Sequence, residues 1–252
     1  MATSPESSAA PSAAASAAVQ ALEGGLVVSC QAGAGHPLAD PEIIARLAAC
    51  AELGGAVGVR VESAEDVRAV RSRIGLPVIG IRKVEVGAHR PFITPTLADC
   101  AALADAGADI IALEAVPDNR AHADEAADLI RVVREELGRP VMADVSTLEE
   151  GLAAWAAGAD LVGTTLSGYT LASASRVGPD LGLVADLARH GVRAVLEGRV
   201  DRPEQVRAAF EAGAWTVVVG TAITDPISLT RRYAAGVPRT RRGVEPNRVP
   251  RE

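Results

Sequence analysis

The chain has 252 residues and a formal net charge of −7. This acidic balance argues against nucleic acid as a partner, because phosphate-backbone binding needs a concentrated basic face. Hydrophobic residues make up 48% of the chain and aromatic residues only 2%, so we expect a core of Ala, Val, Leu and Ile. The sequence has no apolar run near the roughly 20 residues of a membrane span, and its three cysteines lack metal-ligand spacing. These features predict a soluble, cytoplasmic protein with reduced thiols and no membrane partner.

The two ends of the chain differ in composition from the middle. Residues 1–20 are rich in Ala and Ser and lack the basic and leucine-rich parts of a signal peptide, so we expect a disordered N-terminal segment. Residues 237–252 are rich in arginine and interrupted by proline, which predicts a basic, flexible C-terminal tail. Residues 21–236 are even in texture and have the size of a single domain.

Within this domain, short runs of Val, Ile and Ala alternate with stretches typical of helices. In chain order, the eight runs span residues 25–31, 56–62, 77–83, 109–115, 140–146, 160–167, 193–199 and 215–223. Thr147 is a helix-capping residue, Pro203 begins a helix, and Gly107, Gly158 and Gly213 each end a helix just before a strand. The alternation predicts parallel strands joined by helical crossovers.

Eight strand–helix units in roughly 210 residues match a compact (β/α)8 TIM barrel, an α/β fold. A doubly wound open sheet is the competing fold, because a local pattern does not show closure. The G-x-G-x-x-G fingerprint of dinucleotide-binding sheets does not follow the first strand, so no nucleotide is implied. In a TIM barrel the chemistry lies at the carboxyl ends of the strands.

Polar residues occupy this position on every predicted strand. In chain order they are Gln31, Arg60, Glu62, Lys83, Glu114, Asp144, Ser146, Thr164, Thr165, Ser167, Glu197 and Arg199, followed by Gly220 and Thr221 after the last strand. If the barrel closes, several of these side chains point into one mouth.

Lys83 is the only lysine of the chain, against 24 arginines. Arginine stays protonated in proteins, whereas a lysine in a partly desolvated pocket can lose its proton. A lysine kept in a chain that uses arginine everywhere else is therefore a candidate base or Schiff-base nucleophile.

Glu197 and Asp144 are carboxylates at the ends of apolar strands. A buried carboxylate is costly, so Glu197 either pairs with a cation such as Arg60 or Arg199 or has a raised pKa that suits proton transfer. Asp144 faces the same choice, and because it precedes a helix cap it can instead orient its neighbours.

Glycines after the last two strands favour an anion site, with ordinary tight turns as the alternative. Gly198 and Gly220 let backbone N–H groups approach a ligand, and the loops after strands seven and eight commonly bind phosphate in TIM barrels. The four histidines are scattered, and we expect no metal.

Six segments in the same order, "GGLVVSCQ", "PVIGIRK", "ADVST", "GTTLSGYT", "LEGR" and "GTAIT", resemble the N-acylglucosamine-6-phosphate 2-epimerase family from Gly25 to Tyr233. The resemblance implies a TIM barrel with no required cofactor. It also implies interconversion of N-acetylmannosamine 6-phosphate and N-acetylglucosamine 6-phosphate in sialic acid degradation, with Lys83 and Glu197 transferring protons. We expect substrate contacts from Gln31, Arg60, Glu114, Asp144 and Thr164, and phosphate contacts from Gly198, Arg199, Gly220 and Thr221.

The chain departs from this family pattern at two places. After strand four the family commonly reads like "IDGTxRPRP", whereas this chain has "LEAVPDNRA", so Glu114 replaces a shorter carboxylate. After "GTAIT" many members have arginine, whereas this chain has Asp225. The phosphate is therefore expected to depend more on backbone amides, with Arg60 or Arg199 supplying charge.

Two other functions fit the same residues. One is a Schiff-base aldolase or synthase that uses Lys83 on a phosphorylated substrate, and the other is a non-catalytic phosphosugar-binding TIM barrel. The alanine-rich helices also permit a homodimer.

Overall fold

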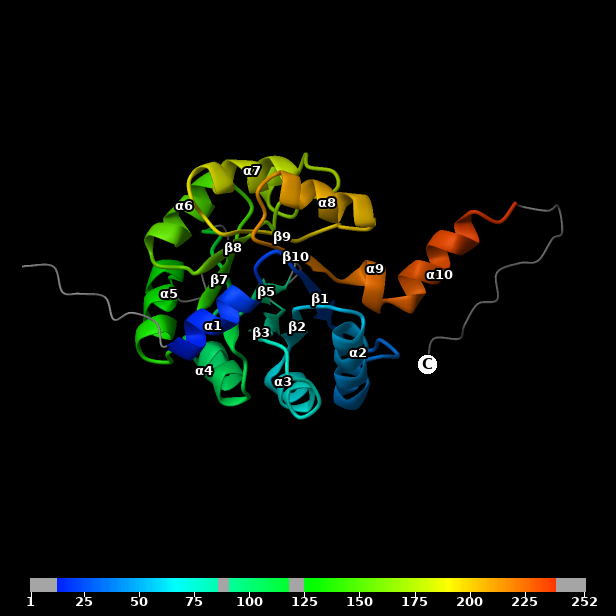
Figure 1. Ribbon diagram of the computed structural model, residues 1–252, viewed down its shortest axis with the longest axis horizontal. Helices are drawn as coiled ribbons and strands as arrows, with labels where there is room; N and C mark the ends of the chain where they lie inside the picture. Colours follow the sequence, from blue (N-terminus) through cyan, green and yellow to red (C-terminus); the bar gives the residue numbers. More distant parts are fainter. Residues whose placement is uncertain (1–12, 86–90, 118–124, 239–252) are drawn as a thin grey trace, which may run out of the picture.

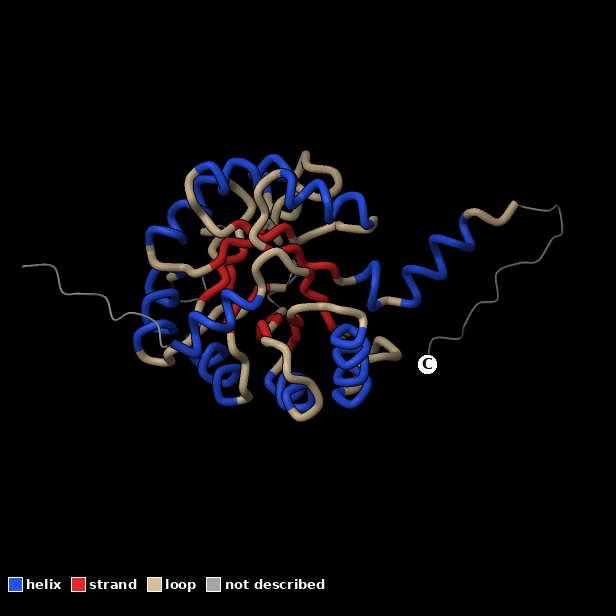
Figure 2. The backbone as a smooth tube through the Cα atoms, viewed as in Figure 1, coloured by secondary structure: helices blue, strands red, loops and turns tan. Residues whose placement is uncertain are grey.

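The computed structural model describes residues 13–85, 91–117 and 125–238. Its central strands are β1 (Leu26–Cys30), β2 (Gly58–Glu62), β3 (Val78–Ile81), β6 (Ile110–Glu114), β7 (Val141–Asp144), β8 (Leu161–Gly163), β9 (Ala194–Leu196) and β10 (Thr216–Val219). They pair in parallel and close into a barrel in the order β1-β10-β9-β8-β7-β6-β3-β2. Figure 2 shows this ring of strands inside a layer of helices. Each predicted run contains one of these strands, and closure excludes the open sheet.

The helices that cover the barrel are α2 (Pro41–Leu53), α3 (Ala64–Arg71), α4 (Leu97–Asp105), α5 (Ala126–Glu135), α6 (Leu148–Ala156), α7 (Leu181–Arg189) and α8 (Pro203–Glu211). Thr147 caps α6 in a reciprocal capping box with Glu150, and Pro203 begins α8, as predicted. Gly107, Gly158 and Gly213 have φ values of 98°, 104° and 96°, which confirms the left-handed helix ends. None of the helices among the described residues is long and apolar enough to cross a membrane.

Alternating side chains divide the strands between two apolar clusters. One set, such as Val59, Ile111 and Val217, packs with the surrounding helices. The other set points into the barrel and includes Ile79, Ile81, Ile110, Met142 and Leu161. Because side chains alternate along a strand, the next residues in the inward series are polar and gather at the carboxyl end of the barrel.

Helix α1 (Ala13–Ala21) lies at the amino end of the barrel, which corrects the expectation of a disordered segment over residues 1–20 for its described part. Val19 and Leu22 are buried in the inward cluster, and the Trp215 indole nitrogen donates to the Val19 carbonyl at 3.3 Å. The alanine-rich composition that suggested disorder also suits a helix, and burial of these two apolar side chains stabilises it. Residues 1–12 and 239–252 lie outside the described part of the chain.

An antiparallel hairpin follows β3 and was not predicted from the sequence. Its strands β4 (Lys83–Val84) and β5 (Phe92–Ile93) pair Lys83 with Ile93 and Val84 with Phe92. Phe92 and Ile93 are buried, so the hairpin is anchored through β5 while β4 carries the lysine. A short 3-10 helix, η2 (Leu171–Ser173), interrupts the loop after β8.

The chain after β10 forms the short helix α9 (Thr221–Thr224) and then α10 (Pro226–Ala235). Figure 1 shows α10 projecting away from the barrel, and none of its residues is buried. Tyr233 is 82% exposed, and Val237, just beyond the helix, is 65% exposed.

Gly80 in β3 provides a test of the tight packing between the barrel and its helices. A Cβ atom at this position would lie 2.7 Å from the Cβ of Ala108, which is attached directly to the backbone and cannot rotate away. We predict that Gly80→Ala lowers the free energy of unfolding by about 1–3 kcal/mol, measured by urea denaturation. The control is Gly182→Ala in α7, where the nearest atom would lie 3.4 Å away and the helix favours alanine. Equal stability of the two variants would contradict this account.

Candidate active site

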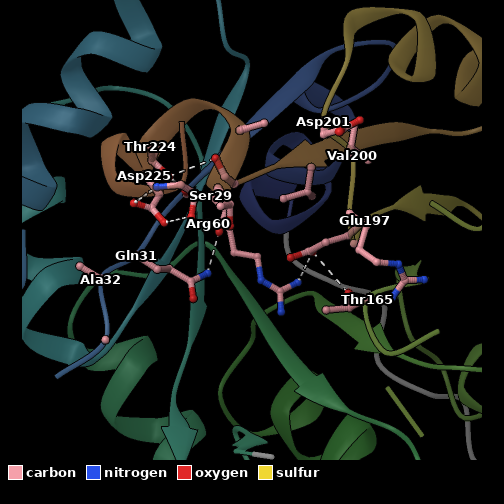
Figure 3. A pocket seen from close by; sticks show the side chains of 18 of the residues that line it. Ser29, Gln31, Ala32, Arg60, Thr165, Glu197, Val200, Asp201, Thr224 and Asp225 are labelled. Atoms are coloured by element: carbon pink, nitrogen blue, oxygen red, sulfur yellow. Dashed lines mark hydrogen bonds and ion pairs between the residues drawn. The ribbon is translucent and has the colours of Figure 1, made fainter. Parts of the chain in front are cut away.

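A cavity of about 780 Å³ opens at the carboxyl end of the barrel. Its wall includes Gln31, Arg60, Lys83 and Glu197, together with all four residues expected at a phosphate, namely Gly198, Arg199, Gly220 and Thr221. Figure 3 shows that the side chains labelled there, among them Gln31, Arg60 and Glu197, come from several different strands and loops. Closure of the barrel therefore brings Lys83, just after β3, and Glu197, just after β9, to one cavity.

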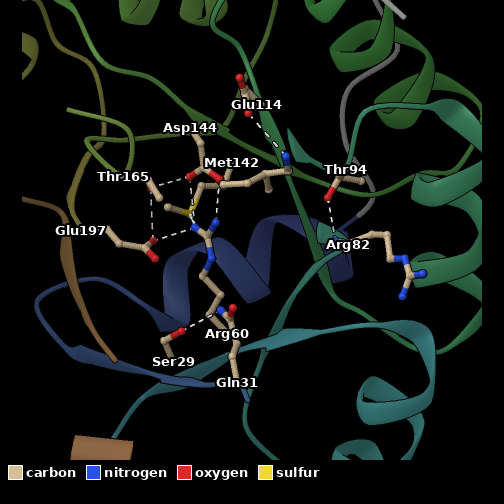
Figure 4. A network of polar contacts seen from close by, with 11 residues as sticks. Ser29, Gln31, Arg60, Arg82, Thr94, Glu114, Met142, Asp144, Thr165 and Glu197 are labelled. Atoms are coloured by element: carbon tan, nitrogen blue, oxygen red, sulfur yellow. Dashed lines mark hydrogen bonds and ion pairs between the residues drawn. The ribbon is translucent and has the colours of Figure 1, made fainter. Parts of the chain in front are cut away.

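Arg60 connects two carboxylates at the floor of this cavity (Figure 4). Its guanidinium contacts both oxygens of Asp144, at 2.6 and 3.0 Å, and Glu197 Oε2 at 2.6 Å. The Thr165 hydroxyl donates to Asp144 at 2.6 Å and lies 3.3 Å from Glu197 Oε2. The Arg60 side chain is 1% exposed and Asp144 is fully buried. Burial lowers the pKa of Arg60, but the two carboxylates outweigh this effect and raise it above its usual value.

The pKa of Glu197 is set by opposing effects of its surroundings. Burial raises its pKa most, and the negative charge of Asp144 adds to the increase, whereas Arg60, the Thr165 hydrogen bond and Lys83 lower it. The net result is a pKa of about 7. A carboxyl group with such a pKa can both accept and release a proton near neutral pH. From the sequence we expected Glu197 either to pair with a cation or to have a raised pKa. In the structure it does both, since it pairs with Arg60 and has a raised pKa.

Three of the expected substrate contacts lie behind the cavity wall. Asp144 is occupied by Arg60 and Thr165, and Glu114 accepts a hydrogen bond from the Ile93 backbone at 3.4 Å. The Thr164 hydroxyl bonds to the backbone of Glu197, at 3.0 Å to the carbonyl and 3.2 Å to the amide. These contacts support the floor and the β4–β5 hairpin. The adjacent Thr165 lines the cavity instead, because successive side chains alternate in direction.

Lys83 is placed by the β4–β5 hairpin, where its partner Ile93 is bonded to Glu114. Its Nζ lies 3.9 Å from Glu62 Oε2, and the side chain is 40% exposed. Gln31, just after β1, donates to the Ser29 hydroxyl at 2.7 Å. The described residues contain no group of three or more His, Cys, Asp or Glu arranged to hold a metal.

One end of the cavity lies beyond β9 and β10 and is lined by Gly198, Asp201, Gly220, Thr221 and Asp225. We call it the phosphate end, after the group that the sequence leads us to expect there. Gly198 and Arg199 both have positive φ values, 105° and 56°, so this turn is held in a conformation that non-glycine residues rarely adopt. Gly220 precedes the first turn of α9, where backbone N–H groups have no partner within the helix. A short extra helix after the last strand is a common phosphate site in TIM barrels.

The residue that departs from the family pattern, Asp225, lies in this same region and caps α10 through the backbone amides of Ile227 and Ser228. His36 Nε2 lies 3.5 Å from Asp225 Oδ1, and both residues line the cavity. His36 and Thr165 also line the cavity but were not among the expected site contacts, although Thr165 was one of the polar residues at the predicted strand ends. His36 is an isolated histidine in a loop, and only the closed barrel brings it beside a residue 189 positions later.

A lysine and a glutamate with a raised pKa in the mouth of a TIM barrel are typical of enzymes that catalyse proton transfer. The family model described as "Putative N-acetylmannosamine-6-phosphate epimerase" matches residues 44–239. The chain therefore belongs to the N-acetylmannosamine-6-phosphate epimerase family, which confirms the resemblance found in the sequence.

Individual relatives and solved structures agree with this placement. Two proteins called "Putative N-acetylmannosamine-6-phosphate 2-epimerase" are similar, one from Caldanaerobacter subterraneus (44% identity, 85% of this chain and 92% of the relative) and one from Thermosynechococcus vestitus (46% identity, 86% and 94%). The solved N-acetylmannosamine-6-phosphate 2-epimerase from Clostridium perfringens superposes with a TM-score of 0.82 at 35% identity, covering 87% of this chain and 96% of that one. A thiamine phosphate pyrophosphorylase from Pyrococcus furiosus, at 16% identity and a TM-score of 0.56, shares the fold alone.

The raised pKa of Glu197 predicts how stability depends on pH. A carboxyl group whose pKa is higher in the folded than in the unfolded state stabilises the fold at low pH, and this contribution is lost as the pH rises through about 7. The free energy of unfolding of the wild type, relative to Glu197→Gln, should therefore fall as the pH rises from about 4.5 to about 7. Urea denaturation at several pH values measures this difference.

The control is Glu211→Gln, which replaces an exposed glutamate at the end of α8 and should show no such trend. Parallel pH profiles for the wild type and Glu197→Gln would show that burial does not raise this pKa.

Proposed function

We propose that the protein interconverts N-acetylmannosamine 6-phosphate and N-acetylglucosamine 6-phosphate by moving a proton at C2, with Lys83 and Glu197 as the two catalytic groups. The observation that carries this assignment is that both side chains line one cavity and Glu197 has a pKa of about 7. Membership of the epimerase family supports the reaction.

The reaction needs one group to remove a proton and another to return one from the opposite face. In the open-chain aldehyde the C2–H bond is acidified by the neighbouring carbonyl. In one direction, Lys83 as the free amine takes the C2 proton, and the bonding electrons form an enediolate over C1 and C2. Protonated Glu197 then gives its proton to the other face of C2. The enzyme leaves this turnover with Lys83 protonated and Glu197 ionised, which is the form that carries out the reverse reaction.

Arg60 is suited to stabilise the enediolate, because its guanidinium lines the cavity floor and stays charged. Asp144 holds the guanidinium through two hydrogen bonds and thereby fixes its position. Thr165 bonds to both carboxylates, which keeps the Glu197 side chain oriented toward the cavity. In this scheme Asp144, Thr164 and Glu114 position other groups, while Gln31 contacts the sugar hydroxyls or the acetamido group.

The phosphate group is assigned to the phosphate end of the cavity. Backbone N–H groups at Gly198, Gly220 and Thr221 approach a ligand without side chains in the way, and Arg199 lies beside them. This leaves the reacting part of an open-chain sugar to extend toward Arg60, Lys83 and Glu197.

The test is a proton NMR assay of N-acetylmannosamine 6-phosphate in heavy water. The wild type should form N-acetylglucosamine 6-phosphate with deuterium at C2, because the proton on the returning group exchanges with solvent. Lys83→Arg keeps the charge but cannot act as a base, so the rate should fall by about 10²- to 10⁴-fold, and Glu197→Gln should lose a similar factor. Arg82→Lys, at the exposed neighbouring position, is the matched control and should keep wild-type activity.

Product without deuterium at C2 would exclude proton abstraction. The aldolase alternative predicts a borohydride-reducible adduct between Lys83 and substrate, which mass spectrometry would locate. A binding protein without catalysis would show thermal stabilisation by the sugar phosphate and no turnover.

We also propose that the enzyme is a homodimer joined through α10. A helix of ten residues is marginal in water unless its apolar face is covered, yet none of the residues of α10 is buried. Leu229 and Tyr233 lie four residues apart and so share one side of the helix, and exposed Val237 follows it. A second copy of the chain is the partner that is always present to cover this surface.

Light scattering after size-exclusion chromatography tests this assembly. The wild type should have twice the mass of the chain, and Tyr233→Asp combined with Val237→Asp should give the monomer mass, because a charge in an apolar interface is costly. Arg231→Glu changes charge on the same helix off this side and should remain dimeric. A monomeric wild type would rule the proposal out.

We place the enzyme in the cytoplasm, in line with free thiols at Cys30, Cys50 and Cys100.

A further inference from the structure

Three non-glycine residues in the described part of the chain have backbone φ angles in the left-handed region. They are Ser63 at 67°, Thr94 at 49° and Arg199 at 56°. Non-glycine residues rarely adopt this conformation, and a β-branched residue such as threonine is an outlier there. A strained residue persists only where its surroundings hold it, and such residues cluster at functional sites. A threonine in this conformation therefore points to a functional role.

Two of these residues bond to the segment that leads into Lys83. The Ser63 N–H donates to the Ile81 carbonyl at 2.8 Å, and the Thr94 N–H donates to the Arg82 carbonyl at 2.6 Å. The Thr94 hydroxyl also accepts the Arg82 N–H at 3.0 Å (Figure 4). Thr94 thus bonds to both backbone groups of the residue directly before the lysine.

The side chain of Thr94, and not only its backbone, makes this contact. Glycine would adopt a φ of 49° without strain, but it has no hydroxyl to accept the Arg82 N–H. Thr94 is 0% exposed, and a buried hydroxyl is tolerated where it is hydrogen-bonded. The strained backbone and the buried hydroxyl therefore serve the same contact with Arg82.

The direction of the Lys83 side chain depends on the backbone from which it extends. The side chain is 40% exposed, and its Nζ lies 3.9 Å from Glu62 Oε2, which is a loose contact. Lysine has a flexible four-carbon stem, so a loose contact at its tip does not by itself fix the amine. Strand β4 has two residues, and the bonds to Thr94 hold the chain where this short strand begins.

We propose that Thr94 is a positioning residue, which fixes the backbone before Lys83 and so directs the lysine amine into the cavity. The inference rests on the proposed function for the role of Lys83 as a base. Thr94 does not line the cavity, so it acts through the lysine and not on the substrate. A displacement of about 1 Å at a group that transfers a proton can lower the rate roughly 10²-fold.

Three substitutions separate the hydroxyl of Thr94 from its backbone conformation. Thr94→Val keeps the branched shape and loses the acceptor, whereas Thr94→Ser keeps the acceptor. Thr94→Gly loses the acceptor but relieves the strained φ angle. Thr96→Val is the matched control, because the Thr96 hydroxyl accepts the Asp99 amide at 3.2 Å and caps α4. Its loss should weaken the fold nearby without changing the backbone before Lys83.

The first measurement is the turnover of N-acetylmannosamine 6-phosphate. Thr94→Val and Thr94→Gly should lower kcat about ten- to hundredfold and leave KM near the wild-type value, because Lys83 acts in the transition state. Thr94→Ser and Thr96→Val should keep the wild-type kcat. If Thr94→Val fails to fold, Thr94→Gly decides. Wild-type kcat in Thr94→Gly, or a loss in Thr94→Ser as large as in Thr94→Gly, would overturn the proposal.

The second measurement needs no turnover, because Lys83 is the only lysine of the chain. The N-hydroxysuccinimide ester of acetic acid acetylates its amine, and mass spectrometry of the Lys83 peptide gives the rate. Thr94→Val and Thr94→Gly should raise this rate severalfold, because a lysine released from its position is more exposed to the reagent. Thr94→Ser and Thr96→Val should match the wild type. Equal rates in all variants would overturn the proposal, whereas the expected rates without any wild-type turnover would count against the proposed function instead.

Discussion

A single buried guanidinium shared by two carboxylates is the interaction on which the active site depends. Arg60 is 1% exposed and bonded to Asp144 and Glu197, so it cannot be removed without leaving two buried acids unpaired. Asp144 accepts hydrogen bonds from both terminal nitrogens of the guanidinium, whereas Glu197 accepts one from Nη1, which also donates to Asp144. One cation does not neutralise two anions in a dry environment, and Glu197, which is less fully bonded, therefore holds a proton readily.

The fold could be read from the sequence because its signals are local and repeated. Each strand is a short apolar run, and glycines such as Gly107 and Gly158 end the preceding helices in a left-handed conformation just before the next strand. Lys83 and Glu197 could be predicted as residues of one site because both lie at the carboxyl ends of predicted strands, and an eight-stranded barrel brings all of these ends together. The composition gave a second reason to single out Lys83, because it is the only lysine of the chain.

Features that depend on contacts between distant segments could not be predicted in this way. Thr164 and Thr165 are adjacent threonines just after β8, and only the folded structure shows that the second of them lines the cavity. The N-terminal helix α1 has the composition of a disordered segment, and its stability comes from burying Val19 and Leu22 under the barrel. His36 belongs to no local motif, because the residue beside it, Asp225, comes only after seven more strands of the barrel.

The two tryptophans of the chain, Trp155 and Trp215, both lie close to Arg193, whose guanidinium is 5.8 and 5.2 Å from the two ring centres. The indole of Trp215 also donates to Val19 of α1. Neither ring lines the cavity at the carboxyl end of the barrel. Intrinsic tryptophan fluorescence of this enzyme should consequently report on the packing of α1 at the amino end of the barrel and not on events in the cavity at the carboxyl end.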